Sequence, residues 1–270
     1  MQQTIADTLL IEGEEELTAE LSQSDSFVRT LAKGLSVICA FGPQSPLTIA
    51  ELARETGLDR ACTRRIVLTL ERLGYVRSDG RRYRLTPRVL NLGYRYLGSL
   101  PFWNLAQPVM EELVTELEKS CSIGVLDGDE VVVVLRVPAR RLLSIDPTIG
   151  SRVPAYAHSM GRILLAFGAE EERANYVSRL FRQPGAQLLG LNRDAFVAAL
   201  RQDGCNGWSF VSDDDGGMCG ISVPILDNRE VCVAAINVSF NIELDARSRA
   251  MRDVLPKLRL ASRRLSGQFG

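Results

Sequence analysis

The segment spanning residues 47–85, LTIAELARETGLDRACTRRIVLTLERLGYVRSDGRRYRL, constrains the fold more than any other part of the chain. Thr48 is a good N-cap residue, and Glu51 stands three positions later, as a capping box requires. Gly57 can end that helix in the left-handed conformation. Asp59 then caps a second helix after a turn of about three residues. Two helices joined by such a short turn predict a helix-turn-helix.

The second helix carries an apolar side and a cationic side. At about 100° per residue, the residues that share one arc and should pack in the core are Cys62, Ile66, Leu70 and Leu73. Those on the opposite side are Arg60, Ala61, Arg64 and Leu68, with Arg65 and Arg72 on the flank. A helix that only packs does not need clustered arginines, whereas one that enters a DNA groove does.

The next segment, YVRSDGRRYRL, predicts a β-hairpin, because Asp79-Gly80 is a preferred pair for a two-residue turn. A hairpin after a helix-turn-helix is a wing, and Arg77, Arg81 and Arg82 place cations at its tip. We expect Arg60 and Arg64 to reach base edges, while Arg65, Arg72, Arg81 and Arg82 hold phosphates. Ala61 and Thr63 are small, and their methyl groups could meet thymine.

Charge is distributed unevenly along the 270 residues, although the net charge is only −1. Residues 1–26 contain seven acidic side chains and no Lys or Arg, so we expect a mobile acidic tail. Residues 54–88 contain ten arginines and four acidic residues, a local charge of +6. Such a block can be a solvated face, but beside a winged helix it favours a nucleic-acid contact.

Two further helices flank the predicted wing. The apolar positions of a helix before it are Phe27, Leu31, Leu35, Ile38 and Phe41. After it, Thr86-Pro87 is an N-cap followed by proline at the first helical position. The apolar positions of that second, linker helix are Leu90, Gly93, Tyr94 and Leu97. It could pack in a core, but an apolar helix between two modules favours a dimer contact.

The remainder of the chain predicts an α+β domain on an antiparallel sheet. CSIGVL and VVVVLR flank the turn at residues 127–129, and GISVPIL and VCVAAINVSF flank the turn at residues 227–228. Helical patterns cover about 105–117, 159–181, 192–203 and 245–266. We divide the chain into an acidic tail (1–26), a winged helix-turn-helix (27–86), a linker and dimerisation helix (87–102) and a second domain (103–270).

Several classes of protein are disfavoured by composition. No apolar run approaches the roughly 20 residues of a membrane span, and a signal-peptide layout is absent, so we expect a cytoplasmic protein. The six cysteines form no CxxC pair and should be reduced, buried thiols. Because the chain has only one histidine, His158, we predict neither a metal site nor a cofactor. No G-x-S-x-G elbow or phosphate loop is present. The adjacent His158-Ser159 pair favours a packed or pocket-lining ring over a hydrolase, because neighbouring residues rarely face one another as nucleophile and base. We predict no enzyme.

The chain resembles the IclR family of bacterial transcription regulators, from about residue 27 to the C-terminus. The resemblance is carried by LTIAELARETGLDRACTRRIVLTLERLGYV, by VPAYAHSMGRILLA, and by GMCGISVPI and AAINVS. RVPARRLLSIDPTIGSRVPAYAHSMGRILLA is similar to the β-ketoadipate pathway subgroup, whose members respond to protocatechuate, 4-hydroxybenzoate or β-ketoadipate. The resemblance implies a GAF-like effector-binding domain and homodimers or homotetramers on palindromic, double-stranded promoter DNA.

The resemblance also implies an effector site between the loop before the SMGR helix and the last two strands. Its residues would be Ser159, Met160, Cys219, Gly220, Asn237 and Ser239. Asp213 would replace the family's acidic residue, although SDDDGGMCG is one residue shorter than the family pattern. For a carboxylate effector, the N-terminus of the SMGR helix is a candidate anion site, and Arg141 or Arg152 a candidate charged partner. RNA polymerase is a candidate further partner. The alternative functions are a ligand sensor acting through protein contacts and, less favoured, a small-molecule hydrolase.

Overall fold

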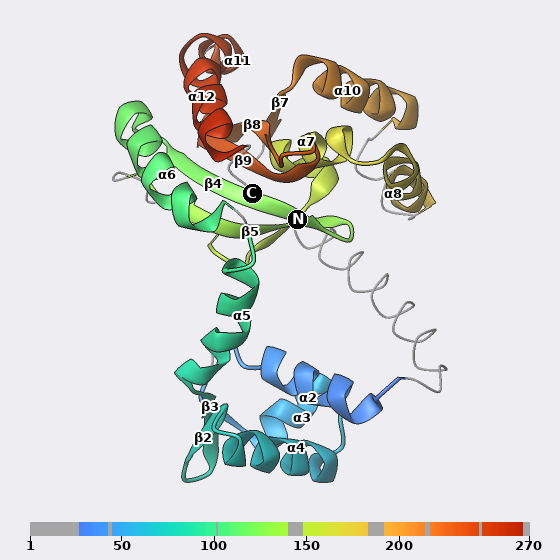
Figure 1. The fold of residues 1–270 in the computed structure, drawn as a ribbon. Coiled ribbons are helices and arrows are strands. Elements are labelled where there is room, and N and C mark those ends of the chain that lie inside the picture. Colours follow the sequence, from blue (N-terminus) through green and yellow to red (C-terminus); the bar gives the residue numbers. More distant parts are fainter. Residues whose placement is uncertain are drawn as a thin grey trace. The chain divides into compact units, whose positions relative to one another are not determined.

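The computed structural model describes residues 27–42, 45–100, 102–139, 148–182, 192–213, 217–242 and 245–266. They divide into two compact units, residues 27–99 and residues 100–266, and each is described by itself (Figure 1). The acidic segment 1–26 and Arg141 lie outside the described residues. Among the residues described, no helix is long and apolar enough to span a membrane.

The N-terminal unit contains the predicted helix-turn-helix. The helices are α2 (Arg29–Cys39), α3 (Ile49–Thr56) and α4 (Arg60–Arg72). The predicted capping box is present: the Thr48 hydroxyl accepts a hydrogen bond from the Glu51 N–H at 3.3 Å, and the Glu51 carboxylate accepts one from the Thr48 N–H at 2.7 Å. Local sequence therefore starts α3 where the pattern predicts.

The turn between α3 and α4 also follows the prediction. Gly57 has a φ of +66°, a left-handed conformation that glycine adopts without steric cost. Asp59 Oδ1 accepts a hydrogen bond from the Cys62 N–H at 2.8 Å and so begins α4. The core of this unit consists of Val37, Phe41, Leu47, Leu52, Ile66, Val67, Leu70 and Val76.

Two predicted packing faces differ from the structure. On α2, Leu31 and Leu35 are exposed, whereas Val37 is buried. On α4, Thr63 and Val67 are buried and Leu73 is 51% exposed, because the chain leaves the helix at Leu73. The buried arc of α4 is therefore centred between Ile66 and Val67 rather than on the predicted set ending at Leu73.

The wing is a three-stranded antiparallel sheet in the order β1-β3-β2. Strand β2 (Val76–Asp79) and β3 (Arg82–Leu85) form the hairpin, and β1 (Leu47–Thr48) adds a short edge that the sequence did not predict. Asp79 pairs with Arg82, so the turn residues are Gly80 and Arg81 rather than Asp79 and Gly80. Gly80 has a φ of +70°, which fits the glycine-first turn of type II′.

The linker forms a 3₁₀ turn, Pro87–Val89, that continues into α5 (Leu90–Leu97). Thr86 accepts a hydrogen bond from the Arg88 N–H at 3.3 Å, as the predicted N-cap should. No residue of α5 is buried, and Leu90 and Tyr94 are 72% and 68% exposed.

The C-terminal unit is built on a six-stranded antiparallel sheet, which confirms the predicted α+β class. In the order β6-β5-β4-β9-β8-β7, its strands are Arg152–Pro154, Glu130–Val137, Ser120–Asp127, Cys232–Asn241, Met218–Leu226 and Ser209–Asp213. The two predicted hairpins are β4–β5 and β8–β9, whereas the short edge strands β6 and β7 were not predicted.

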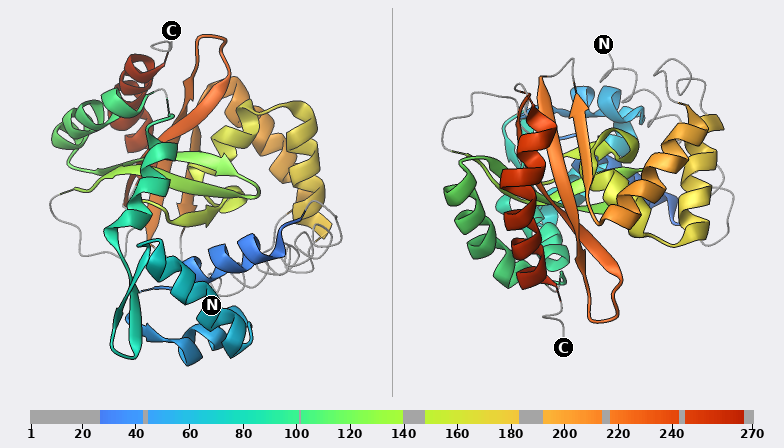
Figure 2. Two further views of the ribbon diagram at one scale, coloured as in Figure 1. Left: turned by 60° about the horizontal axis from the view of Figure 1, so that its bottom comes forward. Right: turned by 90° about the horizontal axis from the view of Figure 1, so that it is seen from above.

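Helices cover both faces of this sheet (Figure 2). The helices are α6 (Trp103–Leu117), α7 (Ser159–Phe167), α8 (Glu170–Arg182), α10 (Arg193–Asn206), α11 (Ala246–Arg249) and α12 (Leu255–Leu265), with a π-helical turn over Ala250–Val254. Helices α6 and α12 lie side by side, while α7 packs on the opposite face with α8 and α10 outside it. The predicted effector residues Ser159 and Asn237 meet on the side of the sheet that faces α7.

Candidate nucleic-acid interface and ligand site

Four arginines of α4 project from the N-terminal unit, and we call them the arginine face: Arg60, Arg64, Arg65 and Arg72. All four are exposed. None of them forms an ion pair with a residue that the structure describes, so their charge is not neutralised within the described chain. An uncompensated cationic helix surface of this kind attracts phosphate groups.

The buried arc of α4 changes the expected orientation of this face. Because Thr63 and Val67 point into the core, the stripe opposite them, at about 100° per residue, runs through Ala61, Arg64 and Arg65. Arg65 thus lies closer to the middle of the exposed side than the sequence suggested. Arg60 lies nearer the edge of the exposed side of α4.

Thr63 corrects one predicted DNA contact. Its side chain is fully buried, and its hydroxyl donates a hydrogen bond to the Asp59 carbonyl at 3.0 Å. A methyl group inside the core cannot meet a thymine, so the expectation for Thr63 was wrong. Ala61, by contrast, is exposed.

The wing arginines have different surroundings. Arg81 is exposed in the turn, and Arg77 pairs across the hairpin with Arg84, which places both on one face. Arg82 donates to the Pro46 carbonyl at 2.8 Å and lies 3.5 Å from the Glu51 carboxylate, so it also ties the wing to the start of α3. Sequence reasoning did not single out Arg84; the two-residue alternation of the hairpin could have found it.

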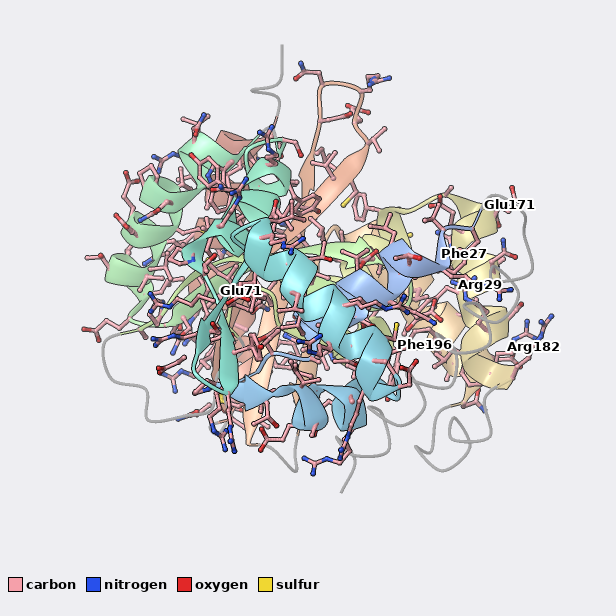
Figure 3. All side chains as sticks on the ribbon, turned by 90° about the horizontal axis from the view of Figure 1, so that it is seen from below. Phe27, Arg29, Glu71, Glu171, Arg182 and Phe196 are labelled. Atoms are coloured by element: carbon pink, nitrogen blue, oxygen red, sulfur yellow. The ribbon has the colours of Figure 1, made fainter. Side chains whose placement is uncertain are left out.

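A polar contact joins α4 to the wing. The carboxylate of Glu71, which is labelled in Figure 3, accepts a hydrogen bond from the Ser78 N–H at 3.1 Å. This bond couples the last turn of α4 to β2.

In the C-terminal unit, three buried polar side chains meet between α7 and the sheet, and we call them the polar cluster: Ser159, Ser222 and Asn237. The Ser159 and Ser222 hydroxyl oxygens are 2.8 Å apart. Asn237 Nδ2 lies 3.0 Å from the Ser159 oxygen and 3.1 Å from the Ser222 oxygen. Two of these residues, Ser159 and Asn237, were predicted effector residues; Ser222 was not.

Because Gly220 has no side chain, it leaves room for the polar cluster beside it. A Cβ at this position would stand 2.8 Å from Asn237 Nδ2 and 3.1 Å from the Ser159 oxygen. Ser239 pairs directly with Gly220 and shares the face of Asn237, two positions away on β9. The structure therefore brings together Ser159, Gly220, Asn237 and Ser239.

The other predicted effector residues do not join this cluster of hydrogen bonds or have undescribed side chains. Cys219 is adjacent to Gly220 in β8 and so points to the other face, where its Sγ lies 3.4 Å from the Phe240 carbonyl oxygen. Met160 is buried in the hydrophobic core with Val131. Asp213 pairs with Met218 at the end of β7, and its side chain lies outside the described residues, as does Arg141.

The N-terminus of α7 is partly satisfied by its own chain. His158 Nδ1 accepts a hydrogen bond from the Met160 N–H at 3.2 Å. Burial lowers the pKa of His158 to about 4, so the ring is neutral near pH 7 and can act as this acceptor. The helix end therefore offers an anion fewer donors than its sequence implies.

Arg152 is held in ion pairs by two acidic side chains. Its guanidinium lies 2.8 Å from Asp127 Oδ2 and pairs in addition with the Glu130 carboxylate. These contacts join β6 to the β4–β5 hairpin, which gives Arg152 a structural role. Among the described residues, no three His, Cys, Asp or Glu side chains are grouped so that they could hold a metal ion.

Both units match models of one protein family. Residues 30–80 match the IclR helix-turn-helix domain, and residues 94–267 match the C-terminal domain of the bacterial transcriptional regulator IclR. The chain belongs to the IclR family. It is thus a transcriptional regulator, as the resemblance of its motifs indicated.

Individual IclR relatives align over most of the chain. The Pca regulon regulatory protein of Pseudomonas putida is 37% identical over 90% of this chain and 84% of its own length. A crystal structure of a transcriptional regulator from Rhodococcus sp. RHA1 is also 37% identical, with a TM-score of 0.77, covering 88% of this chain and 97% of that one. The crystal structure of an IclR homologue from Microbacterium hydrocarbonoxydans, complexed with 4-hydroxybenzoate, is 22% identical and has a TM-score of 0.72. The match covers 87% of this chain and 97% of that one, and it shows the shared fold.

Proposed function

We propose that this IclR-family regulator binds an operator through α4 and the wing, and that a small carboxylate from aromatic-compound catabolism controls that binding. The observation that carries the proposal is the arginine face, which is exposed and forms no ion pair with the described residues. In this proposal Arg64 and Arg65 reach base edges in the major groove. Arg60, Arg72, Arg77 and Arg81 hold phosphates.

The class of effector rests on the relatives and on the chemistry of the polar cluster. The Pseudomonas relative is named for the Pca regulon, and the Microbacterium homologue was crystallised with 4-hydroxybenzoate. Ser159, Ser222 and Asn237 offer hydroxyl and amide groups beside Gly220, between α7 and the sheet. A few polar groups in an apolar surrounding are typical of a small-molecule site.

Self-association is part of the proposal. Helix α5 exposes Leu90, Leu92, Tyr94 and Tyr96, and a helix this apolar is best covered by a second copy of the chain. A dimer would present two copies of α4 to two half-sites related by a two-fold axis. RNA polymerase stays a candidate partner, and operator DNA places the site of action in the bacterial cytoplasm.

A gel shift with the DNA upstream of the protein's own gene tests the proposal. We expect a specific complex that survives excess unrelated DNA, and whose affinity changes when protocatechuate, 4-hydroxybenzoate or β-ketoadipate is added. A ligand must bind one arrangement of the DNA-binding units better than the other to have this effect. Absence of a specific complex would instead favour a sensor that acts through protein contacts.

A further inference from the structure

A line of polar residues crosses five strands of the six-stranded sheet, and we call it the polar row. In strand order β5-β4-β9-β8-β7, its members are Arg136, Ser122, Asn237, Ser222 and Ser209, and each is paired directly with the next. Directly paired residues of antiparallel strands project from the same face. Because Ser159 of α7 contacts Ser222 and Asn237, the whole row lies on the face that α7 covers.

This row extends the polar cluster toward β5. Ser122 and Asn237 are 3% and 1% exposed, so their polar groups are withdrawn from water and need partners. Asn237 Nδ2 donates to the Ile221 carbonyl oxygen at 3.1 Å. A carbonyl can only accept, so this contact fixes the orientation of the amide and directs Oδ1 the other way. No residue in the described part of the chain donates to Oδ1.

Arg136 supplies a cation at the β5 end of the row. It is half-buried, and one terminal nitrogen donates to the Ser122 hydroxyl oxygen at 3.2 Å. That contact holds the guanidinium over the sheet face rather than out in solvent. A guanidinium presents its donors in a planar fork that matches the two oxygens of a carboxylate.

The other candidate anion sites lie off this row. Arg152 bridges Asp127 and Glu130 at the turn end of the β4–β5 hairpin. At the α7 N-terminus, His158 accepts a hydrogen bond from the Met160 N–H. Arg136 stands on the same sheet face as the polar cluster.

We infer that Arg136, oriented by Ser122, binds the carboxylate of the effector, with Asn237 Oδ1 accepting a hydrogen bond from a donor elsewhere on the ligand. This assignment rests on the proposed function and adds to it the group that selects an acid over a neutral analogue. The ligand class is a small carboxylic acid that carries a hydroxyl group at a distance from its carboxylate.

Calorimetric titration of the full chain with 4-hydroxybenzoate, protocatechuate, β-ketoadipate and the neutral 4-hydroxybenzamide tests this inference. We expect the wild type to bind a hydroxylated acid and to bind 4-hydroxybenzamide at least tenfold more weakly than 4-hydroxybenzoate. In Arg136→Met, affinity for the acid should fall by about 10- to 100-fold, because hydrogen bonds to a charged group are among the stronger ones. Affinity for the amide should change little, whereas a merely structural role of Arg136 would weaken both.

Two further variants sharpen the test. Arg179→Met removes an arginine that pairs with Asp129 away from the row, and it should bind the acid like the wild type. If Arg136→Met does not fold, the Arg136→Lys variant replaces it in the titration, because lysine keeps the positive charge but lacks the planar fork of donors. Weaker binding of the acid by this variant supports the inference, and unchanged binding overturns it.

The outcomes separate this inference from the proposed function. A wild type that binds an acid, together with an Arg136→Met variant that binds it within twofold, would refute the role of Arg136 and leave the regulator proposal standing. A wild type that shifts its operator but binds none of the acids would refute the effector part of the proposed function, and this inference with it.

Discussion

Arg162 of α7 binds the carboxylate of Asp203 of α10, with Nε 2.9 Å and a terminal nitrogen 2.8 Å from the same oxygen, Oδ2. The Asp203 side chain is only 9% exposed, and burial raises its pKa even though Arg162 acts in the opposite direction. This pair anchors the helix that begins at the polar cluster. It links α7 to the helix outside it.

Breaking this pair should destabilise the C-terminal unit. In Arg162→Met, the Asp203 carboxylate is left buried without its partner, and we expect the free energy of unfolding to fall by about 2–3 kcal/mol. The double variant Arg162→Met/Asp203→Asn should recover part of that loss. Urea unfolding measures both, and Arg179→Met, whose pair with Asp129 is more exposed, should cost less than about 1 kcal/mol.

Arg64 should contribute sequence discrimination. We expect Arg64→Ala to relax the preference of the protein at one base pair of each half-site by about 1–3 kcal/mol, the size of a good bidentate base contact. Competition gel shifts against single-base operator variants measure this. Arg54→Ala removes an exposed arginine of α3 and serves as the control; equal weakening of every sequence by Arg64→Ala would contradict its role at the base edge.

Arg81 should contribute affinity without discrimination. It is exposed at the tip of the wing, and we expect Arg81→Ala to weaken binding to all sequences alike. The slope of log K against log salt concentration should become shallower by about one unit for the lost phosphate contact. Arg82→Ala should show, in addition, a lower melting temperature, because Arg82 also holds the Pro46 carbonyl. An unchanged salt slope in Arg81→Ala would rule out the phosphate contact.

His158 should make stability depend on pH. Its pKa in the folded protein is about 4, below the ordinary 6.5, so between these values the unfolded chain binds a proton that the folded chain does not. This histidine therefore lowers the free energy of unfolding as pH falls from about 6.5 toward 4. His158→Asn keeps an N-cap side chain but cannot titrate, so its melting temperature should drop less between pH 7.5 and pH 5. Identical drops in both proteins would disprove the assignment.

Gly161 should tolerate no side chain. A Cβ at Gly161 would stand 2.2 Å from the Ala155 carbonyl oxygen, so the backbone before α7 would have to move. We expect Gly161→Ala to cost about 3 kcal/mol and to weaken effector binding, because α7 carries Ser159. At Gly204 in α10 the nearest atom would be 3.5 Å away, and Gly204→Ala should be neutral or stabilising by about 0.5 kcal/mol. Thermal unfolding of the two variants compares them directly.

The helix-turn-helix could be predicted because its signals are local. Thr48, Gly57 and Asp59 act on backbone groups within four residues of themselves, so spacing alone identifies them. The same is true of the two hairpins of the C-terminal unit. Which sides of α2 and α4 face the core was harder to predict, because a helix with apolar residues on two sides can bury either side. Val67 enters the core, and Leu73 is exposed because the chain leaves α4 there.

The residues that meet at the polar cluster could be predicted only in part. Family motifs indicated Ser159, Gly220 and Asn237, and the structure brings these together. They also indicated Cys219, which strand alternation turns to the other face. Ser222 lies two residues after Gly220 on β8, so strand alternation could have added it, whereas Arg136 reaches this sheet face only through its partner on the neighbouring strand.

By itself, the sequence determined where the N-terminal helices begin and end, that a cationic helix is followed by a hairpin, and which family the chain resembles. These features depend on interactions between residues close together in the chain. Only the tertiary structure decided that Arg136, Ser122, Asn237, Ser222 and Ser209 form one line, and that Arg152 is already paired. Strand register and burial join residues far apart in the chain, and local spacing carries no information about either.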